Sequence, residues 1–265
     1  MSWQVIGTSV IGTSHTVSGK PCQDSHGFQN LPGDIMILAV ADGLGTAEKS
    51  DTGSRLAVDT ALATLAGALG NSPPTADETR AALENAFLTA RASLESRADA
   101  DGLALRDLGT TLICVVLTPD WIACGQIGDG AVVALQPDDT QVTVSSPQRG
   151  EYANETVPLT TQDALSMVCY THQEIKVKAL AMISDGLQNL ALINPGYLPF
   201  IPFFKPFFDL ILSKPLDMDQ TRTRLETFLN SERICGRTDD DKTFVLAGWL
   251  APVSQEEQSL QFDHL

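Results

Sequence analysis

Acidic residues follow apolar, strand-like segments at three places in this chain. Asp42-Gly43 ends IMILAVADG, Asp129-Gly130 ends WIACGQIGDG, and Asp185-Gly186 ends KALAMISDG. A fourth acidic cluster, Asp239-Asp240-Asp241, stands directly before the run TFVLAGWL. Desolvating several carboxylates near one another costs free energy unless a cation neutralises them. Oxygen ligands without His or Cys suit Mg²⁺ or Mn²⁺ rather than zinc. The pattern therefore predicts a divalent metal site.

The segments that position these carboxylates can be read from hydrophobic periodicity. Apolar residues at helical spacing predict a helix over 50–69, and a capping-box pair, Thr75 and Glu78, begins a second helix. Short β-rich runs between 109 and 146, separated by turns, predict an antiparallel meander. Further strands are expected at 3–11, 35–41, 179–184 and 243–250, with a turn-rich loop between the first two. A helix capped by Asp219 is expected at 220–230. Residues 147–176 are expected to be polar and irregular.

Two long helices placed together, with strands before and after them, favour an α+β fold over a regular alternation around a parallel sheet. The chain has 265 residues, of which 43% are hydrophobic, so it can bury the core of one large domain. The last residues, 253–265, are expected to form a polar tail.

Charge and cysteine usage limit the partners and the compartment. The net charge of −16 argues against nucleic acid or an anionic membrane as a partner. The N-terminus lacks the pattern of a signal peptide, and no apolar stretch reaches membrane-spanning length. The cysteines show no paired spacing, which indicates small buried side chains in a reducing compartment. We therefore expect a cytoplasmic protein.

Six short motifs, in order along the chain, resemble those of the metal-dependent type 2C serine/threonine protein phosphatases, in particular bacterial members. They are CQDSHGF (22–28), VADGLG (40–45), LGTTL (108–112), GQIGDG (125–130), MISDGL (182–187) and DDDKTFVL (239–246). The resemblance implies a central antiparallel β-sandwich flanked by helix pairs, in four layers α-β-β-α. It further implies a single phosphatase-like domain over 1–252, with a flap-like insertion at about 147–176.

The same resemblance implies a role for each matched acidic residue. Asp42 would bridge two Mn²⁺ or Mg²⁺ ions, and the carbonyl of Gly43 would bind one of them. Asp185 and Asp240 would hold one ion together, while Asp24 would act through coordinated water. Asp129 would help to hold a weaker third ion, although an Asp in a hairpin turn also has a purely structural explanation. A hydroxide bridging the ions would attack the phosphoryl group in line.

Three positions depart from the family pattern. Leu44 stands where many members have a histidine that protonates the leaving oxygen, and Gln23 replaces a frequent glutamate. The arginine expected to contact phosphate is missing, and Lys20 supplies a cation nearby without the bidentate guanidinium. His15 and His26 flank the first motif and could replace the missing donor, although histidines in polar loops are commonly only solvated.

We therefore expect a phosphoserine/phosphothreonine protein phosphatase that opposes a kinase. The alternative is a pseudophosphatase, a metal-containing module that binds phosphoproteins without efficient turnover. The aromatic segment 198–212, LPFIPFFKPFFDLIL, is interrupted by Pro202 and Pro206 and is expected to pack in the core, with a docking surface for a partner as the second interpretation.

Overall fold

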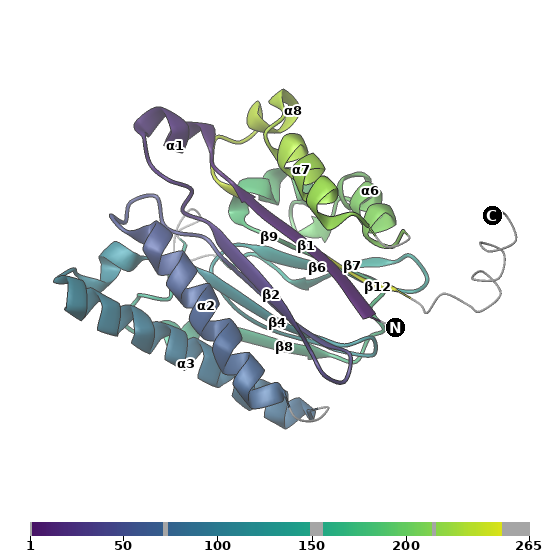
Figure 1. Cartoon of the computed structure of the whole chain (residues 1–265), viewed down its shortest axis with the longest axis horizontal. Coiled ribbons are helices and arrows are strands. Elements are labelled where there is room, and N and C mark those ends of the chain that lie inside the picture. Colours follow the sequence, from purple (N-terminus) through teal and green to yellow (C-terminus); the bar gives the residue numbers. More distant parts are fainter. Residues whose placement is uncertain (1, 71–73, 149–155, 214–215, 251–265) are drawn as a thin grey trace, which may run out of the picture.

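Two five-stranded antiparallel sheets form the centre of the protein (Figure 1). The computed structural model describes residues 2–70, 74–148, 156–213 and 216–250. The β1 sheet has the order β1 (Ser2–Val10), β12 (Lys242–Leu250), β9 (Ala179–Ile183), β6 (Ala131–Leu135) and β7 (Gln141–Ser145). The β2 sheet has the order β2 (Ser25–Leu31), β3 (Ile35–Ala41), β4 (Leu112–Leu117), β5 (Ile122–Ile127) and β8 (Cys169–Gln173).

Alternation along the buried strands divides the core into layers. In β3, Met36 and Leu38 join a cluster with Met182 and Val245 of the β1 sheet, so these side chains fill the space between the sheets. Ile37 and its alternate neighbours face the other way, toward the helices. Because successive side chains of a strand point to opposite faces, one fully apolar strand serves both layers.

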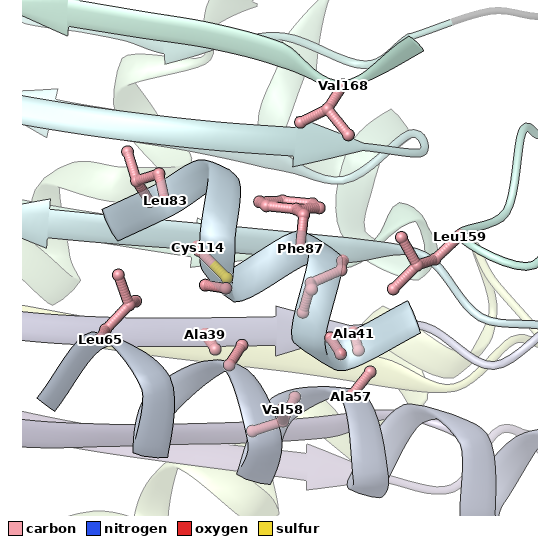
Figure 2. Packing of buried hydrophobic residues seen from close by; sticks show 14 of the residues in the cluster. Ala39, Ala41, Ala57, Val58, Leu65, Leu83, Phe87, Cys114, Leu159 and Val168 are labelled. Atoms are coloured by element: carbon pink, nitrogen blue, oxygen red, sulfur yellow. The ribbon is translucent and has the colours of Figure 1, made fainter. Parts of the chain in front are cut away.

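The helices α2 (Ser50–Leu69) and α3 (Ala76–Asp101) cover the outer face of the β2 sheet (Figure 1). Phe87 of α3 and Leu65 of α2 pack there with strand residues such as Cys114, as Figure 2 shows. The predicted capping box is present, since Thr75 accepts from the Glu78 N–H while the Glu78 carboxylate accepts from the Thr75 N–H. Both predicted helices are confirmed.

Shorter helices cover the outer face of the β1 sheet: α5 (Gln188–Ala191), α6 (Ile201–Ile211), α7 (Met218–Leu229) and α8 (Glu232–Cys235). Phe204 and Phe208 of α6 are buried against Phe244 of β12. Core packing is therefore confirmed for the buried face of α6 within segment 198–212, whereas Leu198, Phe200 and Ile201 are exposed. The segment is also more regular than its prolines suggested. Pro202 lies in the first turn, where its missing N–H costs nothing, and Pro206 is accommodated inside the helix.

Four other sequence expectations need correction. The runs between 109 and 146 do not form one meander, because β5 and β6 lie in different sheets and the chain crosses between them at Gly128–Gly130. The turn-rich loop contains the helix α1 (Thr13–Ser18) and the strand β2. Within 147–176, whose residues 149–155 lie outside the described chain, the short helix α4 (Ala164–Met167) and β8 are regular. The side chain that caps α7 is Asp217, not Asp219.

The remaining described elements are short: the 3₁₀ turns η1 (Leu105–Leu108) and η2 (Asp185–Leu187), and the two-stranded pair β10 (Leu192–Ile193) and β11 (Leu198–Pro199). None of the five cysteines, all of them described, forms a disulfide. Among the helices of the described ranges, none combines the length and apolar character that crossing a membrane requires.

Candidate metal centre

Asp42 lies where β3 ends, and its backbone is held by the segment that leads into β4. Its N–H donates to Thr111 Oγ1 at 2.9 Å, and its carbonyl accepts from the Thr111 N–H at 2.8 Å. The next residue must be small, because a Cβ at Gly43 would come within 2.6 Å of the Gln23 carbonyl and 2.7 Å of the Ser50 carbonyl. The motif VADGLG is thus fixed between two neighbouring segments.

Asp185 reaches the same point from the β1 sheet, and Asp129 reaches it from the crossing between the two sheets. Asp129 lies at the crossing between β5 and β6, and Asp185 opens η2 directly after β9. Each of Asp42, Asp129 and Asp185 offers a carboxylate oxygen, and these oxygens lie within 4.8 Å of one another. They line a pocket of about 210 Å³ at one end of the sandwich.

Asp24 lies directly before β2 and is almost fully buried. Its Oδ2 accepts hydrogen bonds from Ser184 Oγ at 2.7 Å and Thr243 Oγ1 at 2.8 Å, while its Oδ1 has no hydrogen-bond partner. Because Ser184 precedes Asp185, the same hydrogen bonds fix Asp24 against the strand end that carries Asp185. Asp24 itself does not line the pocket.

The acidic triplet before β12 divides into three different environments. Asp240 is exposed and lines the pocket, though it lies outside the group of three close carboxylates. Asp239 is exposed, and its carbonyl accepts from Ser14. Asp241 is buried and joins two N-terminal segments, because Oδ1 accepts from the Gly12 N–H at 2.6 Å and Oδ2 from the Gln23 N–H at 2.5 Å. Its role is to hold the loops around the pocket.

Burial, with the charges of neighbouring carboxylates adding to it, raises the pKa values of these groups. Burial, followed by the charges of Asp185 and Asp241, raises the pKa of Asp24 to about 7. Burial also raises the pKa of Asp185 to about 6, with the Asp129 and Asp240 charges adding to it. Burial of the Asp42 carboxylate, followed by the charges of Asp24 and Asp185, raises its pKa well above the ordinary range. The residue as a whole still keeps some exposed surface. Ionised together, these groups repel one another.

The donor set fits a hard divalent cation. Asp24, Asp129 and Asp185 each carry one buried Oδ1 atom that has no hydrogen-bond partner. Buried polar atoms without partners are rare, and two of these three belong to residues that line one acidic pocket, Asp129 and Asp185. This indicates a ligand that supplies the missing interactions. A divalent cation would satisfy these oxygens and offset the repulsion that raises their pKa values.

The two histidines near the first motif have different surroundings. His15 lines the pocket, and its Nδ1 lies 3.0 Å from Asp241 Oδ2, although the N–H is not aligned for a hydrogen bond. His26 lies in β2, with Nδ1 2.8 Å from Ser9 Oγ, and burial lowers its pKa to about 4. His26 is therefore neutral near pH 7 and outside the pocket, whereas His15 belongs to it.

Leu44 and Lys20 lie at the edge of the same pocket. Leu44 lines it, so an apolar side chain stands at this part of the wall. Lys20 is exposed, and its Nζ donates to the carbonyl of Gly45, another lining residue, at 2.6 Å. The ammonium group is thus held beside the pocket rather than inside it.

The structure thus brings together most of the residues that the sequence singled out. Sequence reasoning did not assign Thr111, the buried Asp241 clamp, or the Ser184 and Thr243 hydroxyls that hold Asp24. The second threonine of LGTTL was the available signal for Thr111. The partners of Asp24 are far from it in sequence, so nothing in the local pattern identifies them.

Comparison with known proteins places this site in a family. Residues 11–230 match the family described as Protein phosphatase 2C. Over 254 residues the chain is 35% identical to Serine/threonine-protein phosphatase 3 of Escherichia coli (strain K12), covering 94% of this chain and 99% of the relative. The chain belongs to the protein phosphatase 2C family, which confirms the resemblance seen in its motifs. It is accordingly a hydrolase of the phosphatase class, and the family implies dependence on a divalent metal.

Solved structures support the fold. The serine/threonine phosphatase PstP/Ppp of Mycobacterium tuberculosis matches with a TM-score of 0.62 at 18% identity, covering 94% of this chain and 99% of that one. Serine/threonine phosphatase Stp1 of Staphylococcus aureus matches with a TM-score of 0.65 at 13% identity, covering 93% and 94%. The predicted α+β sandwich is confirmed. The relatives named in these comparisons are phosphatases, and nothing in them favours the pseudophosphatase alternative.

Proposed function

We propose that the chain removes phosphate from phosphoserine and phosphothreonine residues of proteins, using two Mn²⁺ or Mg²⁺ ions with a weaker third. The observation that carries this proposal is the group of three carboxylate oxygens, from Asp42, Asp129 and Asp185, within 4.8 Å of one another. Asp42 would contact both ions, and the Gly43 carbonyl would bind one of them. Asp185 and Asp240 would together hold one ion. Asp24 would contact coordinated water, and Asp129 would hold the third ion.

When bound, such cations activate a water nucleophile near neutral pH and offset the charge of the phosphoryl group. The chain's own residues fix the geometry. Thr111 holds the backbone of Asp42, and Ser184 and Thr243 orient Asp24 through hydrogen bonds to one of its oxygens. The other oxygen of Asp24 is left for a partner in the site.

His15 is the residue we assign to protonation of the leaving serine or threonine oxygen. It lines the pocket, and its Nδ1 lies 3.0 Å from Asp241 Oδ2, on the side of the ring away from Gly45. Its other ring nitrogen, Nε2, lies on the side of Gly45, another lining residue. Lys20, fixed to the Gly45 carbonyl, supplies a positive charge for an incoming phosphate from the rim.

The proposal extends to the cellular setting. We propose that residues 1–252 act as one phosphatase-like domain in the cytoplasm of a bacterium and that the enzyme opposes a protein kinase in signalling. The absence of a matched arginine for phosphate leaves Lys20 as the proposed side-chain contact, so recognition of phosphate would depend more on the ions than on side chains.

The test is manganese-dependent hydrolysis of p-nitrophenyl phosphate and of a phosphothreonine peptide. Wild type is compared with Asp42→Asn and Asp185→Asn, which keep side-chain size but remove the charge that binds cations. Asp59→Asn, at an exposed position of α2, is the matched control. We expect kcat in both site variants to fall by about three orders of magnitude or more, with folding retained by circular dichroism.

Calorimetric titration with Mn²⁺ separates the two parts of the proposal. If the wild-type protein binds Mn²⁺ but hydrolyses neither substrate, the result would favour the pseudophosphatase interpretation. Turnover that persists in EDTA, or that survives in Asp42→Asn, would contradict the metal centre itself. For the proton donor, His15→Gln is expected to lower kcat by about 10²-fold with the peptide, and less with p-nitrophenyl phosphate, whose leaving group needs no proton.

A further inference from the structure

A second pocket lies outside the metal centre, on the outer face of the β1 sheet. It has a volume of about 600 Å³ and lies among α5, α6, α7 and α8. Its floor is aromatic and rigid, because the ring of Phe207 packs 5.1 Å from Phe228 and 4.8 Å from Phe244, measured between centroids. A volume in this range is typical of sites that enclose a ligand or a large side chain.

Apolar surface continues from the pocket mouth onto the neighbouring strands. Phe200, which lines the pocket, is 42% exposed, and Ile201 is 56% exposed. Ile193 and Leu198, paired across β10 and β11, are also exposed. These are four of the seven large apolar side chains that are exposed in the described residues. An open apolar surface extending from a pocket suits a polypeptide better than a small molecule that the pocket alone would enclose.

The charged residues that line this pocket are all arginines: Arg224, Arg233 and Arg237. All three are exposed, and within the described residues none has a carboxylate within ion-pair distance, unlike Arg80 and Arg97 of α3. The whole chain has 33 acidic and 17 basic residues. Three unpaired arginines around an apolar pocket therefore make a local positive site on an acidic protein, and charge complementarity selects an acidic partner.

The pocket is connected to the metal centre at two points of the chain. η2 and α5 follow each other directly, so Leu190 in the pocket wall lies five residues beyond Asp185, or about 10 Å along the helical path. On the other side, Arg237 precedes Asp240 by three residues. A fully extended segment of five residues reaches about 17 Å, which is longer than the path of about 10 Å from Asp185 to Leu190. One segment of a substrate could therefore occupy both sites.

We propose that this pocket binds a segment of the phosphorylated protein substrate that carries a large apolar anchor flanked by acidic residues. The inference rests on the proposed function and names the kind of substrate. The anchor enters between α6 and α7 over Phe207, and the acidic residues pair with Arg224, Arg233 and Arg237. The phosphorylated residue of the same segment lies about five residues away, at the metal centre.

The experiment compares two phosphothreonine peptides on the full chain with Mn²⁺. Both share the phosphothreonine core. One carries Asp-Glu-Phe-Glu-Leu about five residues from the phosphothreonine, and the other carries Ser-Gln-Ser-Gln-Ser there. We expect KM for the first peptide to be about tenfold lower at low salt, with kcat similar, and the advantage to shrink as salt rises.

The variant that tests the surface is Arg224→Glu with Arg233→Glu, which reverses two charges on α7 and α8 and leaves the metal-site residues unchanged. It should abolish the difference between the peptides while turnover of p-nitrophenyl phosphate stays as in wild type. Arg55→Glu, at an exposed position of α2 on the other face, should keep the difference. Equal KM values for the two peptides in wild type, or a difference that survives the double variant, would overturn the proposal.

Further measurements distinguish a substrate segment from other occupants of the pocket. They also distinguish failure of this inference from failure of the proposed function. Fluorescence anisotropy with the unphosphorylated Asp-Glu-Phe-Glu-Leu peptide tests the surface without catalysis, so binding without any p-nitrophenyl phosphate turnover would contradict only the proposed function. A dimer that becomes monomeric in the double variant would assign the surface to a second copy of the chain. Stronger peptide binding after Leu260→Ser with Phe262→Ser would assign it to the chain's own acidic tail. Either of these two results would overturn the proposal.

Discussion

The buried carboxylate Asp24 should make the metal-free protein less stable as the pH rises. Its pKa moves from 3.8 to about 7 because burial and two neighbouring carboxylates disfavour its charge. The folded protein therefore binds more protons than the unfolded chain between these two values, so its stability falls as pH rises through that window and levels off above it. Because one pKa unit corresponds to about 1.36 kcal/mol, the free energy of unfolding falls by up to about 4 kcal/mol across this window.

Asp24→Asn isolates this contribution. The amide oxygen can still accept hydrogen bonds from Ser184 and Thr243, but it does not titrate. In EDTA, we expect the variant to gain free energy of unfolding relative to wild type as pH rises from about 4 to 7, by up to about 4 kcal/mol. Asp59→Asn removes an equal charge at an exposed position and controls for the general repulsion of an acidic chain.

The measurement is urea unfolding followed by tryptophan fluorescence at several pH values, with and without Mn²⁺. Trp3 is buried and lies 5.0 Å from Trp249, so unfolding changes the environment of both rings. Saturating Mn²⁺ should remove the advantage of Asp24→Asn at pH 7.5, because a bound cation stabilises the ionised carboxylate. A difference between Asp24→Asn and wild type that does not change with pH would refute the reasoning.

Three further perturbations test the packing around the site. Gly186→Ala should destabilise by about 2 kcal/mol or more in thermal unfolding, because its Cβ would collide with the Asp241 carbonyl. Gly67→Ala, exposed in α2 with no atom near its Cβ, should instead stabilise by about 0.5–1 kcal/mol, and equal effects would contradict the steric argument. Phe204→Ala should lower the free energy of unfolding by about 3–5 kcal/mol in chemical denaturation, and Phe200→Ala, at an exposed position, should lower it far less. Similar losses in the two variants would mean that α6 does not depend on its buried face. Asp241→Asn should lose about 1–3 kcal/mol, because the two backbone N–H groups donate to different oxygens and the NH2 that replaces one of them cannot accept. An unchanged midpoint in urea would argue against the clamp.

The buried strands could be predicted from sequence because their side chains are apolar on both faces. The strand predicted at 35–41 is observed as β3, and the carboxylate after it was placed at the strand end. The edge strands β2 and β8 were missed, since SHGFQNL and CYTHQ are polar, half-exposed and without alternation. What makes them strands is pairing with β3 and β5, which is a tertiary contact.

The acidic site was recognisable by type, but its supporting structure was not. Gly128-Asp129-Gly130 has the composition of a hairpin turn, yet the chain there passes from one sheet to the other, and Gly128 has a positive φ of 110°. The cap of α7 was misplaced by two residues because Asp217 and Asp219 are equally good capping residues by type. The hydrogen-bond partners of Asp24 come from β12 and the end of β9, which no local pattern could connect to it.

The three close carboxylates come from different parts of the sandwich. Asp42 follows a strand of the β2 sheet, Asp185 follows a strand of the β1 sheet, and Asp129 lies on the crossing between them. The distances among their oxygens therefore depend on the spacing of the two sheets, which the side chains of Met36 and Met182 help to set. Substitutions in this inner layer would alter cation affinity without touching a carboxylate. The core and the site cannot evolve independently, because selection on either one also acts on the other.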